Sequence, residues 1–163
     1  MFILKLKMVH FMVFCMAIAA FGTSVFAEMV LAKEPCQLCL ISRYAYLSIA
    51  LIALSSVRWP ILRILLLLAV VFGLSFGLYH LGVENHWWIG PRGCISKLPT
   101  LNDSGSDFLD DNRVYCDRVN WLVFGVSSTL WNFLLSACVF WLVSVGCVLH
   151  FYLGKENEHS AKD

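Results

Sequence analysis

Charged side chains are scarce in this chain, and neither sign of charge is in excess. Only 14% of the 163 residues are Asp, Glu, Lys or Arg, and the formal net charge is +1. So small a net charge excludes both a basic surface for nucleic acid and an acidic tail, and it identifies no partner. The sequence also lacks internal repeats and low-complexity tracts. Repeat architectures are therefore excluded.

Apolar residues are abundant instead. They make up 60% of the chain, and the mean hydropathy is +0.75. A domain of this length cannot bury so much apolar side chain in a core of its own. The sequence therefore predicts an integral membrane protein, for which lipid is the solvent.

Four stretches are long and apolar enough, or nearly so, to cross a bilayer core of about 30 Å, which needs roughly 20 helical residues. They cover about residues 8–27, 40–57, 61–83 and 128–153, although the last run can also be started at Leu122. Inside lipid each span must satisfy its own backbone hydrogen bonds, which predicts helices. The expected fold is all-α, a single membrane domain over residues 1–163 with a long outer loop at about 84–120.

The first apolar run has an alternative interpretation as a secretory signal. Lys5 and Lys7 precede it, and Val25, Phe26 and Ala27 resemble a small-residue cleavage site before Glu28. The run is longer than the apolar part of most signal peptides, which favours a span. Cleavage would leave the rest of the topology unchanged.

Basic residues suggest which end of the bundle faces the cytosol. Lys5 and Lys7 precede the first span, and Arg58 and Arg63 crowd the very short connection between the second and third spans. These are positions where the positive-inside rule is most reliable. The termini are then cytosolic. Four of the cysteines, Cys36, Cys39, Cys94 and Cys116, then lie on the outer face, where disulfides persist. In a bacterial inner membrane this face is periplasmic.

The seven cysteines fall into two groups. Three lie within predicted spans, where a thiol is usually a small buried apolar group: Cys15, Cys138 and Cys147. The other four lie where membrane meets water. They are a tight pair, Cys36 and Cys39, which opens the second span, and a separated pair, Cys94 and Cys116, in the outer loop. Such a pattern indicates electron transfer between dithiols and a molecule dissolved in the bilayer.

Each pair can be explained in more than one way. Cysteines with two residues between them can close a disulfide with little backbone movement, and a helix N-terminus favours the Cys39 thiolate. A Cys94–Cys116 disulfide could be purely structural, worth roughly 3 kcal/mol from loop closure, or it could exchange with an incoming thiolate. All four thiolates together could instead bind zinc, although structural zinc sites usually contain two tight pairs.

Arg43 follows Cys39 by four residues and therefore lies on the same helical face, one turn deeper. It could reach back to the lipid headgroups, or its charge could stabilise the Cys39 thiolate and a partly reduced carbonyl oxygen. His80 and Glu84 are also four residues apart. They could pass protons or simply form an interfacial hydrogen bond, and the role of the nearby His86 is open.

These features resemble the DsbB family of bacterial membrane oxidoreductases. The resemblance covers nearly the whole chain, from the four spans and Arg43 to the loop cysteines. It rests on the combination of these features with the segment Cys36-Gln37-Leu38-Cys39 at the start of the second span, because a Cys-x-x-Cys segment alone is weak evidence. The segment from Cys116 to Trp121 is also similar to family sequence.

The resemblance implies a four-helix bundle that reoxidises DsbA, a soluble thioredoxin-like dithiol oxidase, and passes the electrons to ubiquinone or menaquinone. It further implies that Cys94 forms a mixed disulfide with the partner and that Cys116 is its disulfide mate. Cys36 and Cys39 would then reoxidise the loop pair. Cys39 would contact the quinone, with Arg43 polarising a quinone oxygen.

Two other functions fit some of the same features. A vitamin K epoxide reductase-like quinone oxidoreductase is also a small bundle with a membrane Cys-x-x-Cys, but there the tight pair usually lies late in the chain. The second alternative is a non-catalytic membrane protein stabilised by a disulfide or by zinc.

Overall fold

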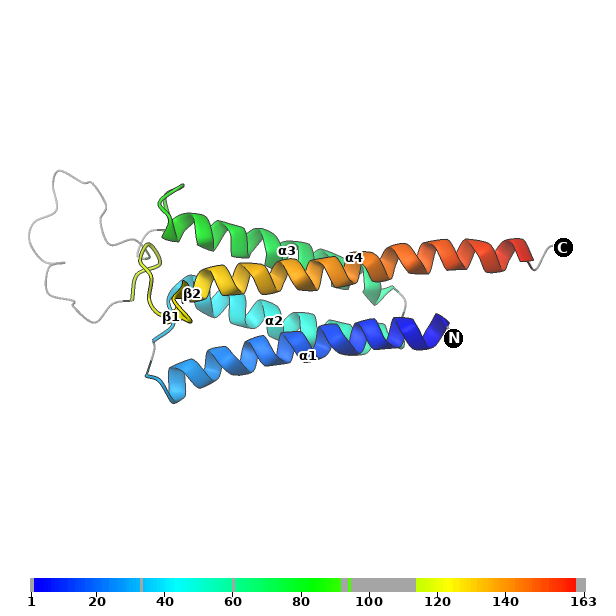
Figure 1. Cartoon of the computed structure of the whole chain (residues 1–163), viewed down its shortest axis with the longest axis horizontal. Helices are drawn as coiled ribbons and strands as arrows, with labels where there is room; N and C mark the ends of the chain where they lie inside the picture. Colours follow the sequence, from blue (N-terminus) through cyan, green and yellow to red (C-terminus); the bar gives the residue numbers. More distant parts are fainter. Residues whose placement is uncertain (1, 33, 60, 92–93, 95–113, 161–163) are drawn as a thin grey trace, which may run out of the picture.

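The structure of the protein is a computed structural model that describes residues 2–32, 34–59, 61–91, 94 and 114–160. Its main elements are four long helices, α1 (Phe2–Met29), α2 (Gln37–Ser56), α3 (Leu62–Glu84) and α4 (Ser128–Ser160). They lie side by side in an elongated bundle (Figure 1). Each contains a segment long and apolar enough to cross a membrane. The predicted all-α, four-helix membrane fold is confirmed.

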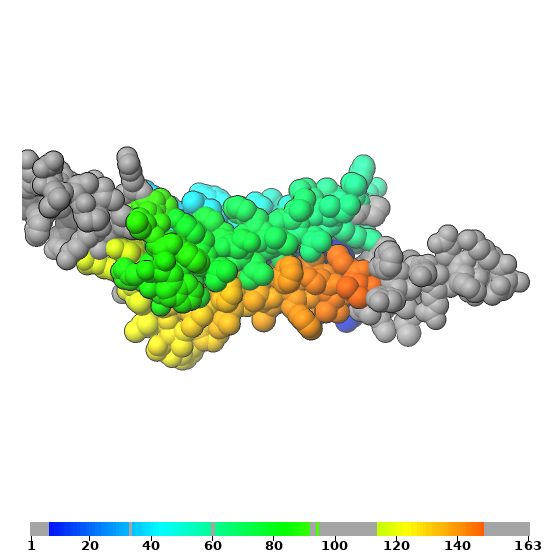
Figure 2. All heavy atoms as spheres, turned by 90° about the horizontal axis from the view of Figure 1, so that it is seen from above, coloured from blue at the N-terminus to red at the C-terminus, as the bar shows by residue number. Residues whose placement is uncertain are grey.

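The helices form a closed ring in which α1 contacts α2 and α4, and α3 contacts the same two helices. Figure 2 shows α3 and α4 running along one another. Small residues such as Ala17, Ala50 and Ala53 are fully buried where helices meet, which allows close backbone approach. Large apolar side chains cover the outside, for example Phe11 and Trp141, which are 63% and 69% exposed. This outward apolar surface suits lipid as the surrounding solvent.

A polar contact within the bundle ties α2 to α4. The Tyr46 hydroxyl lies 2.8 Å from Ser136 Oγ and donates to the Asn132 carbonyl at 3.0 Å. Asn132 Nδ2 also donates to Ser42 Oγ at 3.4 Å. Hydrogen bonds between membrane helices are typically worth about 0.6 kcal/mol each, but they fix which faces of the helices meet.

The start of the last helix is set by a short hairpin that the sequence did not predict. Strands β1 (Leu122–Val123) and β2 (Val126–Ser127) pair antiparallel, with Val123 opposite Val126. The two turn residues, Phe124 and Gly125, have φ of 52° and 78°. Two positive φ values in succession are typical of a tight hairpin turn. The final helix therefore begins at Ser128 rather than at Leu122.

The antiparallel arrangement brings several helix ends together. The end of α1, the start of α2, the end of α3 and the start of α4 meet at one end of the bundle, beside the hairpin (Figure 1). The start of α1 and the end of α4 lie toward the other end (Figure 1). Residues 36, 39, 80, 94 and 116 all fall at the first of these ends.

Candidate active site

Cys36 immediately precedes α2, and Cys39 lies in its first turn. Cys36 is the N-cap residue, with φ −68° and ψ 168°, and its Sγ accepts a hydrogen bond from the Cys39 backbone N–H at 3.3 Å. The two sulfur atoms lie 2.8 Å apart, and both thiols are free. Cys36 is buried, whereas Cys39 is partly accessible. The two sulfurs are close enough that a two-electron oxidation, with loss of both thiol protons, could join them in a disulfide after little movement of the side chains.

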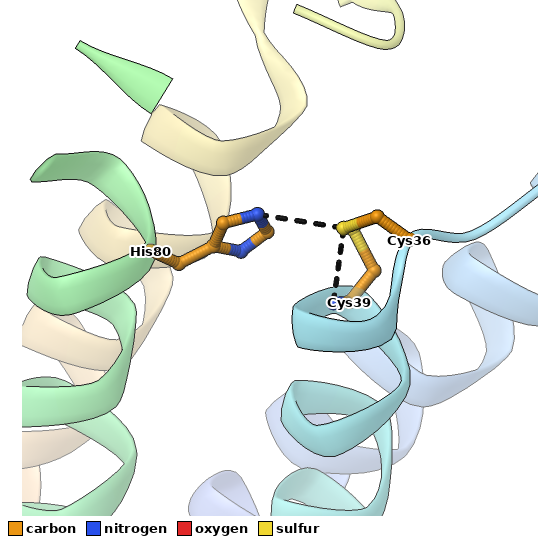
Figure 3. Close-up of side chains that lie close together, drawn as sticks. All are labelled: Cys36, Cys39 and His80. Carbon is orange, nitrogen blue, oxygen red and sulfur yellow. Dashed lines mark hydrogen bonds between the residues drawn. The ribbon is translucent and has the colours of Figure 1, made fainter. Parts of the chain in front are cut away.

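Figure 3 shows His80 of α3 pointing at this pair. Its Nε2 lies 3.5 Å from Cys36 Sγ, and the side chain is only 2% exposed. The other ring nitrogen, Nδ1, has no hydrogen-bond partner among the described residues. The sequence left open a hydrogen bond between His80 and Glu84. Among the described residues, His80 instead contacts the sulfur of Cys36.

The Cys36 thiol has a lowered pKa. A hydrogen bond with the Cys39 thiol lowers the pKa of Cys36 from 9.0 to about 5, against the opposing effect of burial. His80 lowers it further through its hydrogen bond and its charge, and the Cys39 backbone amide also contributes. The sequence predicted a helix-stabilised thiolate at Cys39. The hydrogen bonds from the helix N-terminus and from His80 reach the sulfur of Cys36 instead, because Cys36 caps the helix while Cys39 lies within it.

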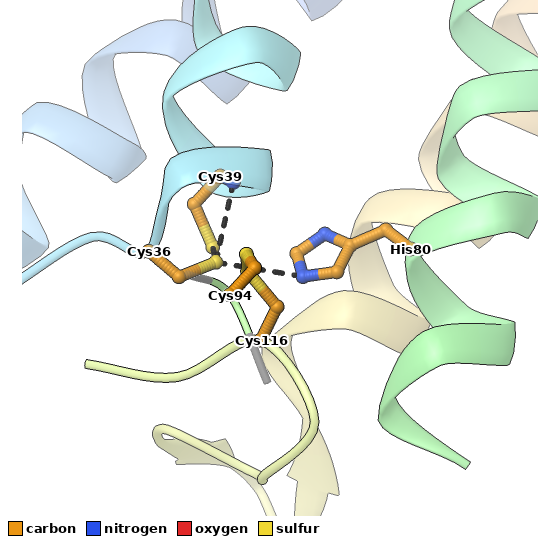
Figure 4. The surroundings of a disulfide bond; sticks show 5 residues. All are labelled: Cys36, Cys39, His80, Cys94 and Cys116. Carbon is orange, nitrogen blue, oxygen red and sulfur yellow. Dashed lines mark hydrogen bonds between the residues drawn. A yellow bond between two sulfur atoms is a disulfide. The ribbon is translucent and has the colours of Figure 1, made fainter. Parts of the chain in front are cut away.

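The loop pair is bonded and packs against the helix pair. Cys94 and Cys116 form a disulfide with Cα atoms 5.1 Å apart, and the Cys116 N–H donates to the Cys94 carbonyl at 2.6 Å. Both residues are 1% exposed and form one buried cluster with Cys36, Leu38 and Val83 (Figure 4). With the loop pair bonded, Cys36 and Cys39 are the free thiols of this cluster.

Arg43 is held by α1. Its Nη1 donates to Glu28 Oε2 at 2.6 Å, its Nε to Ser24 Oγ at 3.1 Å and its Nη2 to the Ser24 carbonyl at 3.2 Å. The Arg43 side chain is 11% exposed, and that of Glu28 is 41% exposed. Sequence reasoning missed both α1 partners. Their four-residue spacing at the end of an apolar run, which places them on one helix face, was the available signal.

A cavity of about 510 Å³ opens beside these groups. Its volume lies in the usual range for small-molecule sites, and its walls are mainly apolar. The helices and the hairpin segment contribute to its lining. The polar or reactive side chains that line it include Cys39, Ser42, Arg43, His80 and Asn132. The described residues thus combine an apolar cavity with a dithiol, an imidazole and a guanidinium.

One small group of side chains has the composition of a metal site. Cys36, Cys39 and His80 each offer one ligand atom, and these three atoms lie within 4.8 Å of one another. The chemical possibilities of the site are therefore disulfide exchange, reduction of a molecule in the cavity and metal ligation.

Comparison with known proteins decides among the families considered. The family model for disulfide bond formation protein DsbB matches residues 6–146. The chain belongs to the DsbB family. This match confirms the family predicted from the sequence and favours it over the vitamin K epoxide reductase-like alternative.

A DsbB-family chain with four apolar helices is a multi-pass membrane protein and a disulfide oxidoreductase. The chain is also similar to the uncharacterized protein RP370 of Rickettsia prowazekii (strain Madrid E), with 24% identity over 156 residues, 90% of each chain. No solved structure matches it. The roles of individual residues in this DsbB-family protein are therefore matters for proposal.

Proposed function

We propose that this DsbB-family protein reoxidises DsbA, a periplasmic thioredoxin-like dithiol oxidase, and passes the electrons to ubiquinone or menaquinone in a bacterial inner membrane. The observation that carries the proposal is the position of Cys36. Its sulfur lies 2.8 Å from Cys39 Sγ and packs in the same buried cluster as the Cys94–Cys116 disulfide. Two cysteine pairs thus pack together, and Cys39 of one pair lines an apolar cavity between the apolar helices.

The proposed cycle begins at the loop pair. A thiolate of the partner attacks Cys94, forming a mixed disulfide and releasing the Cys116 thiolate. The partner's second thiolate then displaces Cys94, so the partner leaves as a disulfide and the loop pair remains as a dithiol. Because both loop cysteines are 1% exposed, the pair must become more accessible before this attack can occur.

The second exchange takes place within the protein. A Cys36–Cys39 disulfide accepts the two electrons of the loop dithiol, so the Cys94–Cys116 bond reforms and the helix pair becomes a dithiol. The structure has this distribution, with the loop pair bonded and the helix pair free. In the proposed cycle it is the arrangement just before electrons leave the protein. The low pKa of Cys36 makes its thiolate a good leaving group when the helix pair is reduced.

The cavity fits a quinone ring. It is mainly apolar, and Cys39 and Arg43 both line it. A bound quinone supplies an acceptor for two electrons and two protons. Arg43 would donate a hydrogen bond to a quinone oxygen, while Cys39 would be the sulfur that contacts the ring. His80 Nε2, 3.5 Å from Cys36 Sγ, is placed to exchange a proton with that thiol.

The direct test is turnover in detergent. Purified protein with a short-chain quinone should oxidise a reduced thioredoxin-like dithiol catalytically, and oxidation should stop when quinone is withheld under nitrogen. Quinone-independent oxidation, or binding of one zinc per chain without any turnover, would instead support the non-catalytic alternative.

A second test concerns orientation. In intact cells, after reduction, a membrane-impermeant maleimide should label Cys94 and Cys116 from the periplasmic side. The engineered variant Ser55→Cys, at the opposite end of α2, serves as the control and should be labelled only after lysis. Labelling with the reverse pattern would place both cysteine pairs in the cytosol and end the proposal.

A further inference from the structure

Cys36, Cys39 and His80 form a group whose chemistry goes beyond disulfide exchange. The two sulfur atoms, at the start of α2, and an imidazole nitrogen of α3 lie within 4.8 Å of one another, and Figure 3 shows the His80 ring directed at the cysteine pair. The His80 ring is almost fully buried, and its Nδ1 has no partner among the described residues. A buried imidazole aimed at a dithiol is a donor set that zinc prefers, since zinc takes thiolate and neutral imidazole ligands.

The distance between Cys36 and His80 fits a tetrahedral zinc ion, and the distance between the two sulfurs needs a small adjustment. With Zn–S near 2.3 Å and Zn–N near 2.0 Å, two ligands of a tetrahedron lie about 3.5 Å apart for S and N, and about 3.8 Å apart for two S atoms. Cys36 Sγ and His80 Nε2 are 3.5 Å apart. The two sulfurs are 2.8 Å apart, so Cys39 must open by about 1 Å, which a small rotation of its side chain provides.

The site also has an entrance and a free coordination position. Cys39 and His80 both line the 510 Å³ cavity, so an ion can approach these two ligands from that side and meet the Cys36 sulfur beside them. Three protein ligands leave the fourth tetrahedral position open toward the cavity, as in zinc sites that bind water or a small ligand.

We propose that the reduced Cys36–Cys39 pair and His80 bind Zn²⁺, and that bound zinc locks the pair in its dithiol form. Zinc replaces the protons of the two thiols, and no electrons are transferred. The oxidised pair has no thiolate to offer, so the site exists only in the reduced protein. If the proposed function holds, zinc is then an inhibitor that captures the enzyme between receiving electrons and passing them on.

The test uses the full-length variant Cys94→Ser/Cys116→Ser, reduced in detergent under nitrogen, titrated with Zn²⁺ and, in parallel, with Co²⁺ as a spectroscopic probe. We expect one metal per chain and thiolate-to-cobalt charge-transfer absorption. Adding His80→Ala should weaken binding by at least about 10- to 100-fold, and adding Cys39→Ser should abolish it. The control, adding Cys138→Ser, removes an exposed thiol of α4 and should change nothing.

Two outcomes would overturn the proposal. If the double variant binds no metal while the reduced wild-type chain does, the site uses all four cysteines. If His80→Ala binds zinc as tightly as its parent, histidine is no ligand. Circular dichroism checks that His80→Ala retains its helices. A second measurement, on the reduced wild-type chain, does not depend on that variant: zinc should slow maleimide labelling of Cys39 but not of Cys15. Equal labelling rates of Cys39 with and without zinc would also refute the site.

These readouts need neither quinone nor a partner protein. Metal binding without turnover would therefore refute the proposed function and leave the zinc site standing, whereas turnover without metal binding would do the reverse.

Discussion

The ion pair between Arg43 and Glu28 leads to the most structure-specific prediction. Arg43 lines the cavity, yet its guanidinium is bound to Glu28 and Ser24 of α1. If Arg43 binds a quinone oxygen, Arg43→Ala removes a charged hydrogen-bond donor, worth about 1.5–3 kcal/mol. The KM for a short-chain quinone should then rise by about 10- to 100-fold, since each 1.4 kcal/mol is about a factor of ten. The KM for the dithiol partner should change far less.

Glu28→Gln should act in the opposite direction. The amide keeps an acceptor for Arg43 but removes the negative charge that competes with the quinone oxygen. Because the Glu28 side chain is 41% exposed, the pair is worth no more than about 1 kcal/mol, so the quinone KM should fall by at most about fivefold. The double variant should match Arg43→Ala alone, since Glu28 acts only through Arg43.

Steady-state kinetics in detergent, with quinone reduction followed by absorbance, measures all four proteins of this cycle. Arg58→Ala is the matched control, because it removes an exposed arginine just beyond the opposite end of α2. Unchanged quinone kinetics in Arg43→Ala would refute the reasoning and leave Arg43 as a structural link between α1 and α2. An effect of Glu28→Gln that persists without Arg43 would refute the coupling.

Three further predictions follow from the same site. Replacing any one of the four outer cysteines by Ser should reduce dithiol oxidation to background; these are Cys36, Cys39, Cys94 and Cys116. The control Cys15→Ser should turn over normally, and a near-normal rate in any of the four variants would refute the proposed electron path. In the reduced Cys94→Ser/Cys116→Ser protein, thiolate absorbance from Cys36 should be present at neutral pH and disappear as the pH falls through about 5, because a lowered pKa keeps the thiolate charged above it; absorbance that appears only near pH 9 would contradict this. A side chain at Gly82 would collide with the Trp88 indole, so Gly82→Ala should destabilise the protein by about 1–3 kcal/mol in thermal unfolding, and an unchanged midpoint would show that Trp88 moves freely.

Hydropathy and cysteine spacing were enough to predict the membrane class, the four helices and the family. The bilayer sets the length of a span, so each expected apolar run overlaps one helix, although α1 begins at Phe2 and α4 continues to Ser160. The hairpin before α4 escaped notice because Leu122 and Val123 continue the apolar run, while the turn depends on positive φ at Phe124 and Gly125. Hydropathy carries no information about that backbone conformation.

The missing parts of the candidate site are contacts between helices. α3 is apolar on nearly every side, so the sequence did not indicate which face packs on α2 or that His80 would meet Cys36. Arg43 and Glu28 are 15 residues apart on different helices, and only the antiparallel packing of α1 on α2 brings them together. Sequence spacing predicts neighbours along one helix, whereas these pairs depend on how helices rotate against each other.

The central claim is that two cysteine pairs form one electron path to quinone, and counting electrons tests it most directly. Fully reduced protein, freed of reductant under nitrogen, should reduce two molecules of quinone per chain, because each of its two dithiols carries two electrons. The Cys94→Ser/Cys116→Ser variant should reduce one, and Cys39→Ser none. A wild-type chain that reduces only one quinone would contradict the account, because the loop pair would then have no route to the membrane acceptor.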